Sequence, residues 1–281
     1  MIKKGDIVVR KSYGKDIIFK VVKIIKSNNS QIAILKGVTL RIEADAPITD
    51  LEIAQKQRVE NNMRNLNTKL EDRIKKCEKS QKKYIPAIDK VFFKRNKEIV
   101  QTGKILHLDG DKRYSEKSEK YYKKMGLNAT VKNIPERKQA MLVKTLLQKY
   151  TPDILVITGH DGMIKKGSGY NDIYNYRNSR YFINAVREAR KWEKQQQNLV
   201  IFAGACQSFF EALMAAGANF ASSPNRILID FIDPLIVAEK IAITEKSRYI
   251  TIRDIENELR DGSAGIGGTG ANGKKKIIVS K

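Results

Sequence analysis

The 281-residue chain contains only two cysteines and two histidines. Two cysteines cannot build a disulfide framework, so the fold has to depend on a hydrophobic core, for which 41% apolar residues are enough. No apolar run approaches the roughly 20 residues of a membrane helix, and the opening Met1-Ile2-Lys3-Lys4 is not typical of a signal peptide. We therefore expect a soluble, cytoplasmic protein without a membrane partner.

Acidic residues are also scarce: 31 Asp and Glu stand against 54 Lys and Arg, which gives a net charge of +23. Such an excess is often a sign of nucleic-acid binding. The basic residues are spread along the chain, however, and no recognition helix, zinc knuckle or aromatic RNA-binding motif accompanies them. The pattern argues against nucleic acid as the main partner.

Residues 1–50 predict a small β domain, because short β-branched runs alternate with turn sequences. This spacing is typical of an SH3-like barrel. The predicted strands cover residues 6–10, 17–22, 31–35 and 39–42.

Residues 51–97 are polar and contain no glycine. Val59, Met63, Leu66 and Leu70 recur at helical spacing, which predicts a long, solvated helical linker between two domains. Cys77 lies in this charged stretch without an apolar strand or a nearby histidine, and we interpret it as incidental.

Residues 98–281 alternate between strands and helices, which predicts a parallel sheet covered by helices on both faces. Active sites of such sheets gather beyond the carboxyl ends of the strands. The glycine-rich segment 261–273 is expected to be a flexible loop. Strands are expected at 104–108, 129–134, 154–160, 199–206, 219–221 and 227–229, and helices at 114–125, 135–150, 179–196 and 208–216.

Two of these strands end in a reactive side chain. The first, beginning at Ile154, runs into His160, and the second, beginning at Leu199, runs into Cys206. A thiol becomes a nucleophile when an imidazole or a helix N-terminus favours its ionised form, and Cys206 has both within reach. A cysteine protease is the interpretation that this pair favours.

Several segments resemble the YabG family of sporulation proteases: 154–161 (ILVITGHD), 202–208 (FAGACQS), 217–224 (GANFASSP), 9–13 (VRKSY) and 106–111 (LHLDGD). The His and Cys positions also resemble those of caspase, legumain and gingipain peptidases. The resemblance implies a caspase-like fold, Cys206 as nucleophile and His160 as acid and base, without a cofactor. It further implies a protease of the mother cell that cleaves spore-coat and related proteins.

The oxyanion hole departs from the wider group, in which a glycine directly follows the histidine. Here Asp161 follows His160 and Gly162 comes next. The backbone N–H of Cys206 is one candidate donor. Asp161 and Gly162 are the other candidates.

The resemblance implies that the loop after the first strand and the segment after the fourth-strand helix line the specificity pocket. These positions hold Asp109 and Asp111, then Ser222 and Ser223. Carboxylates in such a pocket favour Arg or Lys by charge and bidentate geometry. We predict cleavage after basic residues, although Asp109-Gly110-Asp111 is also an ordinary turn sequence.

Three alternatives or additions stay open. A metal hydrolase using His107, Asp109, Asp111 and His160 lacks close ligand spacing. A basic scaffold that binds coat proteins or nucleic acid would need no catalytic pair. Self-cleavage is conceivable, because the lysine-rich segment 51–97 is expected to be exposed.

Overall fold

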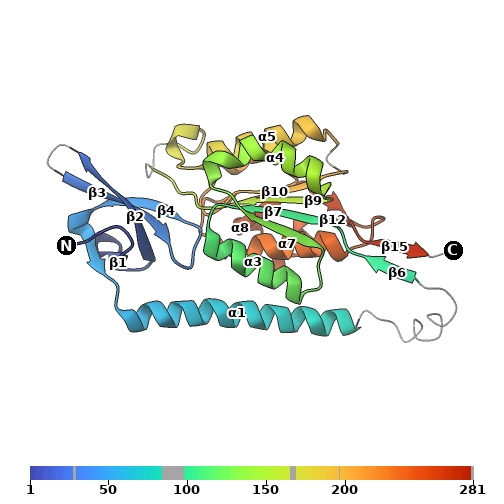
Figure 1. The fold of residues 1–281 in the computed structure, drawn as a ribbon, viewed down its shortest axis with the longest axis horizontal. Helices are drawn as coiled ribbons and strands as arrows, with labels where there is room; N and C mark the ends of the chain where they lie inside the picture. Colours follow the sequence, from blue (N-terminus) through green and yellow to red (C-terminus); the bar gives the residue numbers. More distant parts are fainter. Residues whose placement is uncertain (28–29, 84–97, 165–168, 196, 280–281) are drawn as a thin grey trace.

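The computed structural model describes residues 1–27, 30–83, 98–164, 169–195 and 197–279. Figure 1 shows a small antiparallel sheet at the N-terminal end, a larger α/β unit beside it, and one long helix that runs along both.

The small sheet contains five strands, all antiparallel, in the order β4-β3-β2-β1-β5. Its interior is formed by alternating side chains such as Val8, Val21 and Leu35, all fully buried. An SH3-like barrel stays a prediction. The strands are β1 (Ile7–Arg10), β2 (Ile18–Ser27), β3 (Ser30–Gly37), β4 (Glu43–Pro47) and β5 (Leu51–Ile53).

The prediction of a strand at 39–42 is wrong, because these residues connect β3 to β4. The connection turns tightly: the Gly37 N–H donates to the Ile42 carbonyl at 2.8 Å. A Cβ on Gly37 would lie 2.4 Å from the Leu40 carbonyl oxygen, so the turn needs a glycine there. The loop 38–42 projects toward the α/β unit.

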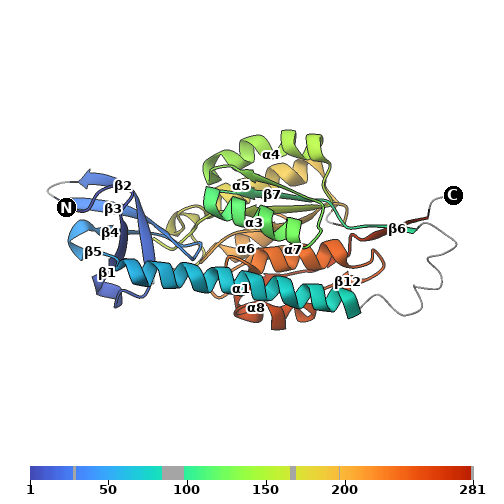
Figure 2. The same cartoon turned by 60° about the horizontal axis from the view of Figure 1, so that its bottom comes forward.

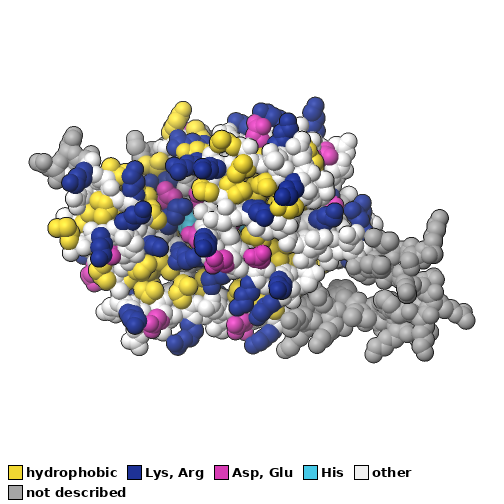
Figure 3. Space-filling view, in the orientation of Figure 1, with side chains coloured by type: hydrophobic (Ala, Val, Ile, Leu, Met, Phe, Trp, Pro, Cys, Tyr) yellow, Lys and Arg dark blue, Asp and Glu magenta, His cyan; other side chains and the backbone are white. Residues whose placement is uncertain are grey.

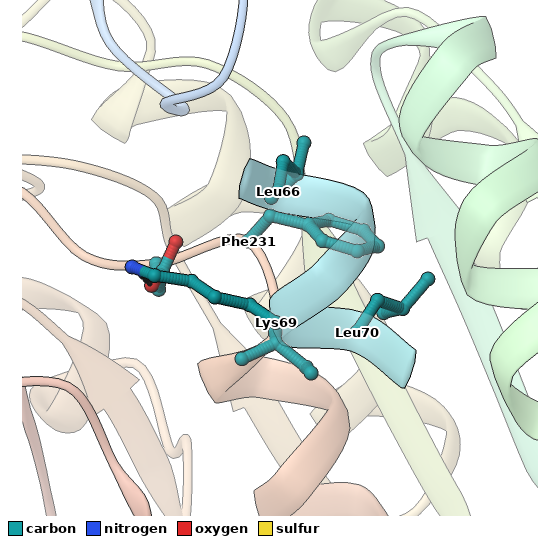
Figure 4. Close-up of a pocket in the computed structure, with 6 residues that line it drawn as sticks. Leu66, Lys69, Leu70 and Phe231 are labelled. Carbon is teal, nitrogen blue, oxygen red and sulfur yellow. Dashed lines mark hydrogen bonds and ion pairs between the residues drawn. The ribbon is translucent and has the colours of Figure 1, made fainter. Parts of the chain in front are cut away.

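Helix α1 (Lys56–Lys83) forms where a linker helix was expected, and most of its described side chains are exposed, but one face is buried. Leu66, Leu70 and Ile74 are buried against the α/β unit. In Figure 4, Leu66, Lys69 and Leu70 lie around Phe231, with a cavity of about 10 Å³ between them. Residues 84–97 and the side chain of Cys77 lie outside what the structure describes.

The α/β unit is built on a six-stranded sheet with the order β13-β11-β10-β9-β7-β8. All neighbours are parallel except β13, which runs antiparallel to β11. A mostly parallel sheet flanked by helices is therefore confirmed, while its caspase-like classification stays a prediction. The strands are β7 (Ile105–Asp109), β8 (Ala129–Asn133), β9 (Ile154–Thr158), β10 (Val200–Ala203), β11 (Phe220–Ser222) and β13 (Ile266–Gly268).

Helices cover both faces of this sheet (Figures 1 and 2), because successive strand residues point to opposite sides. Leu106, Leu155 and Ile201 belong to the core on the side of α4 and α5. Val156 and Phe202 belong to the core on the side of α3 and α7. The helices are α3 (Lys112–Lys124), α4 (Glu136–Tyr150), α5 (Ser179–Trp192), α6 (Phe210–Ala215) and α7 (Asp233–Ile243).

The C-terminal glycine-rich segment is not the flexible loop that its composition predicted. It forms α8 (Gly262–Gly265), the edge strand β13 and β14 (Ala271–Asn272), which pairs with β12 (Tyr249–Ile250). A Cβ on Gly268 would lie 2.3 Å from the Asn219 carbonyl oxygen. The glycine thus serves close packing rather than mobility. Strand β15 (Lys276–Val279) pairs with β6 (Glu98–Gln101).

Of the one or two strands expected at 219–221 and 227–229, only the first forms. Residues 227–229 have no regular secondary structure, and the Ile227 carbonyl accepts a hydrogen bond from the Gln207 N–H in the loop after β10. No helix in the described part of the chain is long and apolar enough to span a membrane. Figure 3 shows Lys and Arg scattered over one face, interspersed with Asp and Glu, rather than gathered into a stripe.

Candidate active site

His160 and Cys206 follow neighbouring strands. β9 and β10 are parallel and hydrogen-bonded, with Ile157 opposite Ala203, a difference of 46 residues in number. His160 and Cys206 differ by the same number, so both lie just beyond the carboxyl ends of these strands at the same level of the sheet. This is the edge at which ligands bind in open α/β sheets.

The loop that carries Cys206 is held in an unusual conformation. Gly204 has φ +113° and Gln207 has φ +56°. The Ser222 hydroxyl donates to the Ala205 carbonyl at 2.9 Å, and the Gln207 N–H donates to the Ser223 hydroxyl oxygen at 3.0 Å. Strained backbone of this kind persists where surrounding contacts enforce it, and it often does so at functional sites.

The Cys206 thiol is fully buried and lies 3.6 Å from the Ile229 carbonyl oxygen, to which it donates. Burial raises the pKa of the thiol to about 12, although a backbone hydrogen bond from Arg41 acts in the opposite direction. The helix expected immediately after Cys206 begins only at Phe210 and has six residues. In this buried position the Cys206 thiol is therefore neutral.

His160 is also fully buried, between two carboxylates. Its Nδ1 lies 3.9 Å from Glu136 Oε1, its Nε2 lies 3.9 Å from Asp111 Oδ2, and its backbone N–H donates to Glu136. Neither ring nitrogen has a hydrogen-bond partner among the residues that the structure describes. Burial lowers the pKa of His160 to about 3, and the charge of Lys36 acts in the same direction. The charges of Asp111 and Glu136 act to raise the pKa.

The Asp161 side chain is held by several hydrogen bonds. The carboxylate accepts hydrogen bonds from the Asn178 N–H and from the Ser179 and Ser208 hydroxyls. Because Ser208 belongs to the loop after β10, this carboxylate ties the two strand-end loops together. Burial raises the pKa of Asp161 to about 6.

An arginine from the N-terminal sheet lies inside the site. Arg41, in the β3–β4 loop, is fully buried, and its Nη1 lies 2.6 Å from Asp109 Oδ2. Its guanidinium stands 4.7 Å from the ring centre of Tyr114 and 5.3 Å from that of Phe231. The Tyr114 ring in turn lies 5.6 Å from that of His160.

The backbone of this loop pairs with the segment after His160. The Asp161 N–H donates to the Arg41 carbonyl at 3.1 Å, and the Glu43 N–H donates to the Asp161 carbonyl at 2.7 Å. Ile42 and Asp161 form a parallel bridge. From β3, Lys36 Nζ reaches Glu136 Oε1 at 3.2 Å. The N-terminal sheet thus covers the edge that carries His160 and Cys206.

Arg41 contacts Asp109, Asp161 and the Cys206 thiol, and His160 lies on the far side of the Tyr114 ring contact. Asp111 lies beside His160 and also caps α3 by accepting from the Arg113 N–H. Ser222 and Ser223 lie under the Cys206 loop, and neither hydrogen-bonds Arg41 among the described residues. The Gly162 N–H donates to the Asp161 carboxylate, which leaves Asp161 as the residue whose N–H faces Arg41.

Sequence reasoning missed Arg41, Glu136 and Tyr114. Glu136 follows Pro135 at a helix start, where an acidic residue is ordinary. The only sequence signal was a glycine just after the predicted strand 104–108 and another near the end of the predicted strand 154–160. The structure explains both, because a Cβ on Gly110 or Gly159 would lie within 2.7 Å of the Glu136 side chain. Nothing local distinguishes Arg41 from other basic residues.

The metal alternative gains no geometric support. His107 lies in the interior, where its ring nitrogens contact the Thr158 hydroxyl at 2.7 Å and the Tyr122 hydroxyl at 3.2 Å. Burial lowers its pKa to about 3. Within the described ranges, no three His, Cys, Asp or Glu side chains are grouped as metal ligands.

A second hollow, of about 310 Å³, lies at the other end of the sheet. It is lined at the amino ends of β7 and β8 by residues including Lys104, Asn128 and Tyr150. The strands separate it from His160 and Cys206, so it is not part of this site.

The fold and site define an α/β protein with a thiol and an imidazole at the carboxyl ends of adjacent parallel strands, an arrangement suited to nucleophilic hydrolysis. The chain belongs to the family described as YabG peptidase U57, whose model matches residues 3–280. It is 37% identical over 283 residues to the sporulation-specific protease YabG of Bacillus subtilis (strain 168), with 97% of this chain and 96% of the relative covered. No solved structure gives a significant match. Membership supports a protease role in sporulation.

Proposed function

We propose that the protein is a cysteine endopeptidase that uses Cys206 as nucleophile and His160 as general acid and base. One observation carries the proposal: a peptide carbonyl, that of Arg41, accepts a hydrogen bond from the Asp161 N–H beside the Cys206 thiol. A substrate carbonyl in the same position would be oriented for attack by sulfur.

In the reaction, the Cys206 proton passes to His160 and the sulfur bonds to the carbonyl carbon. The negative charge on the carbonyl oxygen is stabilised by the Asp161 N–H, which takes the role of the missing glycine, together with the Cys206 N–H. His160 then protonates the departing amine as the C–N bond breaks. Water then attacks the thioester carbonyl while His160 accepts its proton. The C–S bond breaks, the carboxylic acid leaves, and His160 returns the proton to the Cys206 sulfur.

The closed site disfavours the ionised pair, because burial opposes charge on both groups. Asp111 and Glu136, each 3.9 Å from a ring nitrogen of His160, favour the imidazolium. Water and substrate that enter the site make His160 less buried, so these carboxylates then help His160 to take the thiol proton.

We propose cleavage after Arg or Lys, because Asp109 binds the Arg41 guanidinium at 2.6 Å in a fully buried position. Asp111 contributes negative charge nearby. Asp109→Ala is expected to reduce the preference for Arg over Ala before the scissile bond by at least about tenfold. An unchanged preference in Asp109→Ala and Asp111→Ala would contradict this pocket.

The biological setting rests on family membership. We propose that the substrates are spore-coat and related proteins and that the enzyme acts in the mother-cell cytoplasm, with possible association with the forming coat. Self-cleavage in segment 51–97 remains part of this proposal, although residues 84–97 lie outside the described structure.

The test compares wild type, Cys206→Ala and His160→Ala on a denatured arginine-rich protein, with Cys77→Ser as the matched cysteine control. Wild type and Cys77→Ser should cut, and the other two should not. Cleavage should resist EDTA and be abolished by iodoacetamide. Cleavage by Cys206→Ala would end the proposal, and cleavage by none of the four would favour the basic scaffold.

A further inference from the structure

The β3–β4 loop enters the site in the manner of a bound peptide. It adds to the segment after His160 through two main-chain hydrogen bonds, Asp161 N–H to the Arg41 carbonyl and Glu43 N–H to the Asp161 carbonyl. Strand addition of this kind is a general mode of peptide recognition. A Cβ on Gly162 would lie 2.2 Å from the Glu43 carbonyl oxygen, so the site residues leave room for this backbone.

The side chain of Arg41 also lies where the side chain of a bound basic substrate would lie. It fills the space between Asp109, Tyr114 and Phe231 with no exposed surface. An arginine preceding a scissile bond would need the same carboxylate and the same rings. A second basic residue cannot enter while Arg41 is there.

We infer that Arg41 and the β3–β4 loop are a built-in, substrate-like inhibitor, which must leave the Cys206 site before a protein substrate can bind. This inference rests on the proposed function, because it assigns the regulation of the same site. The N-terminal sheet is then the part of the molecule that moves, and the loop competes directly with substrates that carry Arg or Lys.

The contact is also incomplete in a way that permits release. Within the described part of the chain, Nε and Nη2 of Arg41 are buried without a hydrogen-bond partner. Unsatisfied buried donors cost stability, so the loop gains less from the closed site than its buried ion pair suggests. Lys36 forms a second ion pair across this contact, with Glu136, and this ion pair also has to break when the loop leaves the site.

The test measures how fast iodoacetamide alkylates Cys206 in a Cys77→Ser background, and it needs no turnover. Arg41→Ala should react at least about tenfold faster than wild type, since removing a competitor raises the open fraction. Arg10→Ala is the matched control, because Arg10 pairs with Asp50 in the same sheet, and its rate should stay within about twofold of wild type. Arg41→Met replaces Arg41→Ala if the latter does not fold.

Two readouts separate release of an inhibitor from general loosening. N-acetylarginine amide should protect Cys206 from alkylation in Arg41→Ala, whereas N-acetylnorleucine amide should not. For an arginyl peptide substrate, KM should fall about tenfold with kcat unchanged within about twofold. A folded Arg41→Ala or Arg41→Met whose alkylation rate equals that of wild type would overturn the inference. Faster alkylation with arginine protection but no peptide cleavage would refute only the proposed protease activity.

Discussion

The buried pair of Arg41 and Asp109 makes a quantitative prediction about stability. Both side chains have no exposed surface, and their nearest atoms are 2.6 Å apart. Changing Asp109 to Asn keeps an oxygen that can accept from the Asp111 N–H but removes the charge that faces Arg41. Leaving one partner of a buried pair uncompensated costs about 3–5 kcal/mol. Because Asn keeps some hydrogen bonding, we expect the lower end, about 3 kcal/mol.

A double-mutant cycle separates the pair from its surroundings. Arg41→Met should cost about 2 kcal/mol, since Asp109 still accepts from Thr158 and from the Asp111 N–H. The double variant should also cost only about 2–3 kcal/mol rather than the sum of about 5, because neither charge is then left unpaired. The expected coupling is therefore at least about 2 kcal/mol.

The assay is urea unfolding followed by circular dichroism and by the fluorescence of Trp192, the single tryptophan, in α5. Equal slopes for all four proteins would show that the same transition is compared. Strictly additive losses in the double variant would refute the buried-pair account, and with it the claim that the loop is held by this contact.

Three further predictions concern the loops and the buried titratable groups. Gly204→Ala should lower the free energy of unfolding by more than about 2 kcal/mol, because Gly204 has φ +113° and the new Cβ would lie 2.3 Å from the Ser222 hydroxyl. Gly126→Ala is the control and should lower it less, because Gly126 has φ +65° but open space around the new Cβ; thermal unfolding measures both. Asp161 has a pKa raised from 3.8 to about 6, so the folded state keeps a proton that the unfolded state loses. Its contribution to the free energy of unfolding should fall by about 2 kcal/mol as pH rises from 4 to 6.5, measured as the difference between wild type and Asp161→Asn. His107 has a pKa lowered from 6.5 to about 3, so its own contribution to the free energy of unfolding should fall by about 2 kcal/mol on acidification from pH 6.5 to 5, opposite in sign to that of Asp161. This contribution is measured as the difference between wild type and His107→Gln, and a difference that does not change with pH in either pair would contradict that assignment.

The placement of His160 and Cys206 could be predicted because it depends on local pattern and on general topology. Short apolar runs separated by helices predict a parallel sheet, and parallel strands direct their carboxyl ends to one edge. The register then brings the two residues level, since Ile157 pairs with Ala203. The choice of β9 and β10 as neighbours required the structure.

Arg41 could not be predicted, since its role depends on the packing of two distant parts of the chain. Its β-branched surroundings at 39–42 favoured a strand by propensity, but the turn closed by Gly37 and Ile42 overrides that preference. The prediction of a flexible loop at 261–273 was wrong for a similar reason. Its glycines were interpreted as flexibility, whereas Gly267 and Gly268 permit close approach to Phe210 and Asn219.

The departure at Asp161 has a structural explanation. Its side chain is occupied with Ser179, Ser208 and the Asn178 N–H, so only its backbone faces Arg41. A glycine is not needed to supply that N–H. Asp161 thereby supports both strand-end loops while its N–H remains available to a carbonyl oxygen.

A covalent probe can show whether Cys206 attacks peptide bonds after basic residues. The protein is incubated with an arginyl acyloxymethyl ketone, digested and mapped by mass spectrometry, with a norleucyl probe of the same length as control. The account predicts one adduct, on Cys206, that forms with the arginyl probe and is strongly slowed in His160→Ala and Asp109→Asn. Proteolysis that persists while the adduct lies on another residue, or equal labelling by both probes, would contradict it.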